Sequence, residues 1–355
     1  MIGRILNYQK KRYNYESMEE LNMFRYVLKR LLMLIPVLLI MSFLIFGMID
    51  LIPGDPAQMM LGTHVTEEAL EQAREEMGLN DPFLVRYGRF LNDTVHLDLG
   101  KSLMSRRPVW NMLGEKLPAT VELSVFAMIF ALLIGLTAGS IAAWKQNTIL
   151  DYFFSMIALI GISMPVYWLG FMLILLFAVT LNLFPTAGRI AAEMDLSVLS
   201  TNFVLFESLF TGHWDIFTSS VKHMVLPAIA LGTIPMAIIA RMTRSSLLEV
   251  LKQDYMRTAR AKGLKFKDIF IHAIKNAAIP IITVFGMQFG RFMGGAVLTE
   301  TVFAWPGMGK WILDGIYKRD FPVVIGGALT IAFLFVFVNL LTDLTYTLLD
   351  PRIKY

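Results

Sequence analysis

Long uncharged, apolar runs alternate along the chain with polar segments that carry most of its charges. A helix needs roughly 20 apolar residues to cross the hydrocarbon core of a bilayer, which is about 30 Å thick. Six runs come close to this length or exceed it: 31–49, 123–144, 152–188, 224–240, 276–299 and 321–342. The pattern predicts an all-α fold, a polytopic membrane protein with six transmembrane helices.

The third run, 152–188, is too long for one straight helix and too short for two spans and a turn. Charge decides between one crossing and two, because loops rich in Lys and Arg remain in the cytoplasm. The segment 241–275 holds nine basic and three acidic residues, and the first 30 residues hold seven basic ones. One crossing places both segments, and both termini, in the cytoplasm. We therefore expect a single span with a kink at Pro165.

The spans divide the chain into four parts. We expect residues 1–30 to form a cytoplasmic N-terminal extension, 31–50 the first span, 51–117 an extracytoplasmic insertion, and 118–355 a core with five further spans. The insertion contains an acidic stretch at 66–77, which has the pattern of a helix. The first apolar run is longer than the 7–15 residues usual in a signal peptide, so we expect it to remain as a span.

Composition supports the membrane assignment. The 355 residues are 56% hydrophobic and 17% charged, with a mean hydropathy of +0.59, whereas soluble domains have about 25% charged residues. The net charge of +4 does not indicate nucleic-acid binding, because the basic residues cluster beside the apolar runs. The chain contains no cysteine, which excludes disulfides and thiolate nucleophiles.

The sequence offers no catalytic or metal site. Its five histidines are scattered without the spacing of metal ligands, and Gly309-Lys310 lacks the other residues of a phosphate-binding loop. We therefore expect no catalytic residue, no metal and no cofactor bound by this chain. If ATP drives its function, hydrolysis takes place on another polypeptide.

The most informative segment is 254–263, on the predicted cytoplasmic side. Asp254 suits the N-cap of a helix and Gly263 the left-handed position after its end. Between them lie about two turns that include the small residues Ala259 and Ala261. A helix this short is marginal on its own in water, so we expect it to dock against a partner. The simpler alternative is a solvated, positively charged loop.

The sequence of residues 257–263, RTARAKG, resembles the cytoplasmic coupling loop of ABC importer permeases, in the version of the peptide and nickel branch. Arg257 and Thr258 stand where the general family has Glu and Ala. The stretches 239–245, 298–311 and 350–355 agree with the same branch, and the resemblance covers about 23–355. It is most similar to the B-type subunits of dipeptide permeases. Nickel, glutathione and oligopeptide permeases are the alternatives within the class, and a self-contained channel is the alternative outside it.

The resemblance implies a type I ABC importer permease fold in a bacterial cytoplasmic (inner) membrane, surrounded by lipid. It implies a heterodimer with a C-type permease, two ABC ATPase subunits that carry ATP and Mg, and an extracytoplasmic peptide-binding protein; no nucleic acid is implied. The coupling loop would span 245–275. The ATPase-coupling residues would be Tyr255, Arg257, Thr258, Ala259, Arg260, Ala261, Lys262 and Gly263.

Six further positions are candidates for a translocation path or gate. Gly286, Gly290 and Gly294 lie four residues apart in the fifth run, a spacing that favours close helix packing over a role in the path. Arg291 is a charge within the same run, and intramembrane charges are often functional, although this one is near enough to the outer end to reach water. Glu300 and Trp305 belong to the stretch 298–311, which has the pattern of a turn with an interfacial aromatic residue or of a gate.

Overall fold

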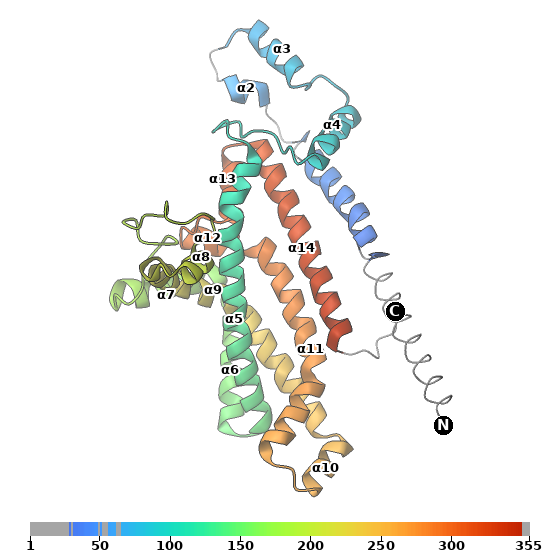
Figure 1. Ribbon diagram of the computed structural model, residues 1–355, viewed down its shortest axis with the longest axis vertical. Helices are drawn as coiled ribbons and strands as arrows, with labels where there is room; N and C mark the ends of the chain where they lie inside the picture. Colours follow the sequence, from blue (N-terminus) through green and yellow to red (C-terminus); the bar gives the residue numbers. More distant parts are fainter. Residues whose placement is uncertain (1–27, 30, 49, 52–55, 62–64, 350–355) are drawn as a thin grey trace, which may run out of the picture.

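The computed structural model describes residues 28–349 except 30, 49, 52–55 and 62–64. The predicted N-terminal extension, residues 1–30, therefore lies outside the described residues apart from 28 and 29. Within the described ranges the fold is helical, with an isolated bridge between Lys101 and Pro108 as its sole β pairing. The longest helices run along the length of the molecule (Figure 1). The prediction of an all-α protein is confirmed.

Among the described residues, five helices are long and apolar enough to cross a membrane. They are Leu31–Met48, α5 (Val109–Trp144), α9 (Trp214–Leu251), α11 (Phe266–Gly295) and α14 (Phe321–Leu349).

The third run forms a bent pair of helices, which is the candidate for the sixth span, and the bend lies where the sequence predicted a kink. α6 (Ile149–Ser163) and α7 (Val166–Leu173), which continues as the π-helix η1 (Ile174–Thr180), meet at an angle of 107°. Pro165 lies at the break and precedes the first residue of α7. Met164, just before it, is extended at φ −84° and ψ 130°, because the proline ring disfavours helical geometry in the preceding residue. The six predicted spans are obtained when the bent pair counts as one.

Three helices, α5, α9 and α11, extend well beyond the apolar runs that predicted them. α5 begins at Val109, so the expected boundary between residues 117 and 118 falls inside this helix. The expected coupling loop, 245–275, is mostly helical, because α9 continues to Leu251 and α11 begins at Phe266. Polar turns at the ends of a span add nothing to its hydropathy, which is why the apolar pattern underestimates the lengths of these helices.

α5 and α9 pack along each other at the centre of the core, and small residues permit the approach. A Cβ on Gly232 of α9 would lie 2.6 Å from the carbonyl oxygen of Ala127, and a Cβ on Gly135 would lie 2.8 Å from that of Met236. Gly139, one turn further along α5, would collide with the carbonyl oxygen of Ala240. Close packing through small residues is therefore confirmed for α5.

The insertion contains α2 (Pro56–Leu61), α3 (Glu67–Glu76) and α4 (Phe83–Val95). Thr66 is the N-cap of α3. α4 packs on the first span through aromatic contacts, including that between Phe46 and Phe90 at 5.2 Å. The insertion lies at one end of the molecule, together with α13 (Met308–Tyr317), while α10 (Asp254–Ala261) lies at the other (Figure 1).

Candidate functional site

α10 is a separate short helix between α9 and α11. Its N-cap is Gln253, whose backbone is extended at φ −68° and ψ 149°, so the prediction that Asp254 caps the helix is wrong. The chain turns into the helix one residue earlier than the side-chain type suggested. Asp254 is instead the first helical residue, and its exposed carboxylate lies 3.6 Å from the guanidinium of Arg257. A negative charge in the first turn still stabilises a helix.

The other end of α10 was predicted correctly. Gly263 follows the C-cap residue Lys262 and has φ +72°. The N–H of Gly263 donates to the carbonyl oxygen of Arg260 at 2.9 Å, and that of Leu264 to the carbonyl oxygen of Ala259 at 3.3 Å. These two hydrogen bonds form a Schellman motif, which ends the helix and turns the chain back toward α11.

The two faces of α10 differ sharply. Met256 is fully buried, and Ala259, one turn further along, is half-buried on the same side. Ala261 is exposed, so it is the small residue that the outward side offers to a partner. The remaining coupling candidates are all exposed: Tyr255, Arg257, Thr258, Arg260, Lys262 and Gly263.

At the opposite end, a buried carboxylate joins three helices. Glu300 of α12 (Val297–Val302) accepts hydrogen bonds from the Thr120 hydroxyl of α5 at 2.6 Å and from the backbone N–H of Lys310 at 2.8 Å. The Thr120 oxygen in turn accepts from the N–H of Met308, the first residue of α13, at 2.7 Å. Burial raises the pKa of Glu300, and these hydrogen bonds oppose the rise. The carboxylate thus holds the start of α13 against α5.

Trp305 is part of the same structure. Its side chain is fully buried, and its indole N–H donates to the carbonyl oxygen of Ala119 at 2.9 Å. Its backbone N–H donates to the carbonyl oxygen of Glu300 at 2.8 Å. Trp305 is therefore an interior anchor in this structure, rather than an aromatic side chain exposed at the interface. Of the six candidate residues for a path or gate, the structure places Glu300 and Trp305 in contact.

A buried ion pair lies next to this region. Arg189 donates to Glu122 of α5 at 2.5 Å and to the carbonyl oxygen of Asn202 at 2.7 Å. The other oxygen of Glu122 accepts from the N–H of Leu205, in the first turn of α8 (Val204–Thr211), at 2.9 Å. Hydrogen bonds from Ser200 and Thr201 lower the pKa of Glu207 to about 2. The segment between η1 and α8 is thus fastened to α5.

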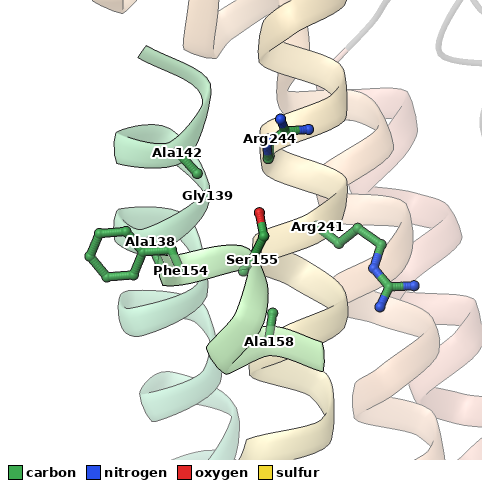
Figure 2. Close-up of a pocket in the computed structure, with 9 residues that line it drawn as sticks. Ala138, Gly139, Ala142, Phe154, Ser155, Ala158, Arg241 and Arg244 are labelled. Atoms are coloured by element: carbon green, nitrogen blue, oxygen red, sulfur yellow. The ribbon is translucent and has the colours of Figure 1, made fainter. Parts of the chain in front are cut away.

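A second ion pair joins α6 to α9. Asp151 receives two hydrogen bonds from Arg244, at 2.6 and 2.8 Å, in a bidentate arrangement. A cavity of about 100 Å³ lies beside it (Figure 2). Its walls are mainly small side chains, and the Arg241 side chain points away from α6. The lining residues are Ala138, Gly139, Ala142, Phe154, Ser155, Ala158, Ala240, Arg241 and Arg244.

The other candidate path residues lie along α11. A Cβ on Gly286 would collide with the side chain of Thr342, and one on Gly290 would lie 3.2 Å from the side-chain oxygen of Asn339, both on α14. Close helix packing is therefore confirmed for these two glycines. Arg291 is exposed and has no hydrogen bond or ion pair with any described residue. Gly294 lies in the last turn of α11.

Comparison with known proteins decides the family. The family described as "Binding-protein-dependent transport system inner membrane component" matches residues 135–355, and its N-terminal component family matches residues 23–124. The chain belongs to this family. It is an ABC importer permease of the peptide and nickel branch, as the sequence motifs predicted, and a multi-pass membrane subunit.

Relatives match this permease over almost its whole length. The dipeptide transport system permease protein DppB of Alkalihalophilus pseudofirmus is 48% identical over 334 residues, which are 94% of this chain and 100% of the relative. DppB of Escherichia coli is 45% identical over 337 residues, 94% of this chain and 99% of the relative. The di/tripeptide transport system permease protein DppB of Pseudomonas aeruginosa is 44% identical over 335 residues, again 94% and 99%.

Sequence reasoning missed the two ion pairs that fasten other segments to α5 and α9, Arg189–Glu122 and Arg244–Asp151. A signal was present, because Glu122, Asp151 and Arg189 each lie at the edge of an apolar run. Charges at such edges are expected from interfacial contact with water alone. The pattern therefore did not separate these buried, paired charges from ordinary interfacial ones.

Proposed function

We propose that this permease is the B-type transmembrane subunit of an ATP-driven dipeptide importer and forms half of its translocation path. The observation that carries the proposal is its identity of 48% over the whole length of a protein named as a dipeptide permease. Relatives named for di/tripeptide and D,D-dipeptide transport also support small peptides as the substrate class. The other half of the path would come from a C-type permease.

The energy for transport would come from two partner ATPase subunits, which bind ATP and Mg. α10 would be the contact point, because its outward side offers exposed polar residues and the small Ala261. The helix is fixed to the permease on one side only, and it lies at the end opposite the insertion (Figure 1). Each permease would seat one such helix on one ATPase. Transport would follow alternating access, a two-state equilibrium that nucleotide and ligand bias.

This arrangement implies an orientation in a bacterial inner membrane. Both termini and α10 would face the cytoplasm, as the basic segment 241–275 favours. The insertion and α13 would face the other side and receive an extracytoplasmic peptide-binding protein.

We also propose that α12 and α13 form a gate element at the outer end of the path. Its support is the buried network of Glu300, Thr120 and Trp305, which fixes α12 and the start of α13 against α5. The exposed Arg291 on the preceding helix would face the path. Gly286 and Gly290 would set how closely α11 and α14 approach behind it.

The test is uptake of a labelled dipeptide into proteoliposomes that hold this chain, its partner permease and both ATPases. The binding protein is added on the side of the membrane that the insertion faces. We expect uptake that requires both ATP and the binding protein. Labelled nickel, glutathione and a pentapeptide are tested in the same way as alternative substrates. Uptake by the chain alone without ATP would support the channel alternative instead. Stronger uptake of one of the other compounds than of the dipeptide would assign the substrate to that class.

A further inference from the structure

A single buried side chain of α10 connects it to the packed interior of the permease. Of the residues of α10, all of which lie in the described part of the chain, Met256 is the one that is buried. The charged side chains of Asp254, Arg257 and Arg260 are exposed, and the ion pair that they form, between Asp254 and Arg257, lies within α10. Since a helix of two turns is marginal on its own, its position depends on Met256, on the two-residue link to α9 and on the turn at Gly263.

Met256 enters a cluster that joins three long helices. We name this group the inner cluster; its buried members are Ala143, Leu247, Met256, Ile269, Ala273, Ala277 and Ile281. Ala143 belongs to α5, Leu247 to α9, and the last four to α11. Trp144 at the end of α5 adds an edge-to-face contact with Phe266 at 4.4 Å, at the start of α11. The ends of the three helices nearest α10 are therefore packed as one apolar unit.

In this geometry the surface that can bind a partner, the outward side of α10, is separate from Met256, the residue that contacts the long helices. The outward side of α10 is polar and exposed, so it can bind a partner without disturbing the inner cluster. Two residues join α10 to α9 and four join it to α11, so the backbone keeps it close to both helices. Within that limit, a displaced α10 can move relative to α9 and α11 only by withdrawing Met256 from the cluster and exposing its side chain to water, which the hydrophobic effect opposes. As long as Met256 stays buried, α9 and α11 follow α10.

We infer that Met256 is the positioning residue that makes the coupling of α10 to α9 and α11 rigid, so that movement of a docked ATPase reaches the transmembrane helices through this buried contact in addition to the short backbone links. The inference rests on the proposed function, because it requires an ATPase on the outward side of α10. It adds the route by which the movement enters the core. The residue acts through packing and touches neither ATP nor peptide.

The test compares three variants in the complete complex. Met256→Ala removes the anchor, Met256→Leu keeps an apolar side chain of similar volume, and Ile274→Ala truncates a residue of α11 that packs on the same cluster. We measure ATPase subunits retained on purification, ATP hydrolysis stimulated by the loaded binding protein, and peptide moved per ATP. The Met256→Ala complex should retain its ATPases. The peptide that it transports per ATP should fall by a factor of about five or more, the lower end of typical coupling factors. Met256→Leu and Ile274→Ala should stay within about twofold of the native complex.

A spectroscopic measurement distinguishes coupling from general stability. The chain has no cysteine, so spin labels can be placed at Lys262→Cys next to α10 and Lys275→Cys on α11. The distance between them should stay the same when ATP is added to the native complex, and should shift and broaden in Met256→Ala.

Three results would overturn the inference: unchanged peptide per ATP in Met256→Ala, loss of the ATPases from that variant, or an equal defect in Ile274→Ala. The first would leave Met256 without a role, the second would make it a support of the docking surface, and the third would make the effect one of cluster stability. If the native complex retains no ATPase at all, the proposed function itself fails, and that outcome is visible before any variant is made.

Discussion

Arg189 and Glu122, 67 residues apart in the sequence, form an ion pair whose two side chains are 9% and 0% exposed. The pair ties the segment before α8 to α5, and Glu122 also accepts the N–H of Leu205. Removing one partner of such a pair leaves the other charge buried and uncompensated, which is more costly than removing both.

Arg189→Met should therefore destabilise the permease by about 3–5 kcal/mol. Glu122→Gln combined with Arg189→Met should lose less, since the neutral amide keeps an oxygen for the N–H of Leu205. Thermal unfolding of the purified complex, followed for both single variants and the double variant, gives the coupling energy. A double variant less stable than either single one would contradict the buried pair.

Glycine substitutions on α5 should separate close packing from helix propensity. Gly139→Ala introduces a Cβ that collides with the carbonyl oxygen of Ala240, and overpacking of this kind costs about 1–3 kcal/mol. Gly114→Ala is the matched control, because nothing lies within 4 Å of its Cβ. It should be neutral or stabilise the helix by up to about 1 kcal/mol. Equal melting temperatures for the two variants would count against the α5–α9 contact.

The network at the start of α13 should depend on one hydroxyl. Thr120→Val removes the group that donates to Glu300 and accepts from Met308, and leaving those groups unsatisfied costs about 1–3 kcal/mol. Thr120→Ser keeps both hydrogen bonds and serves as the control. Uptake and thermal stability should fall together in the valine variant and stay near native in the serine variant. Full stability with valine would mean that Glu300 is held by α13 alone.

Orientation can be tested with single cysteines in this cysteine-free chain. Val198 and Lys262 are both exposed, on the segment before α8 and next to α10. An impermeant thiol reagent applied from outside should label Val198→Cys and leave Lys262→Cys unlabelled until the membrane is opened. Labelling of both from outside would be incompatible with the six-span topology.

The outward side of α10 should tolerate charge removal better than bulk. Ala261→Trp should prevent close approach of an ATPase, and Gly263→Val should distort the turn, since a left-handed conformation costs a residue with a Cβ about 1–2 kcal/mol. Lys262→Ala should change docking little, because an exposed charge is worth under about 1 kcal/mol. Retention of ATPase subunits on the purified permease measures all three. A defect in Lys262→Ala as large as in Ala261→Trp would argue for a purely electrostatic contact.

Local patterns in the sequence predicted much of the fold. Run lengths and charge gave the spans, Pro165 gave the break in the third one, and Gly263 gave the end of α10. The missing information was non-local. Nothing near Glu122 in the sequence indicates Arg189, and nothing near Met256 indicates that it, rather than a neighbour, enters the inner cluster.

The start of α10 shows a smaller limit of the same kind. Asp254 has the better side chain for an N-cap, yet the chain enters the helix at Gln253. The position of the turn is set by where α9 ends and where Met256 must reach, so packing outweighs the preference of one side chain.

α6 has 15 residues and rises about 22 Å, less than the roughly 30 Å of an average hydrocarbon core. At Pro165 the chain turns by 107°, and apolar side chains of α7 such as Trp168 and Phe171 face outward instead of extending the wall. The straight apolar surface of this bent pair is therefore shorter than that of α5, which has 36 residues. A bilayer relieves such hydrophobic mismatch by thinning, so the membrane should be thinner next to α6 than on the far side of the protein.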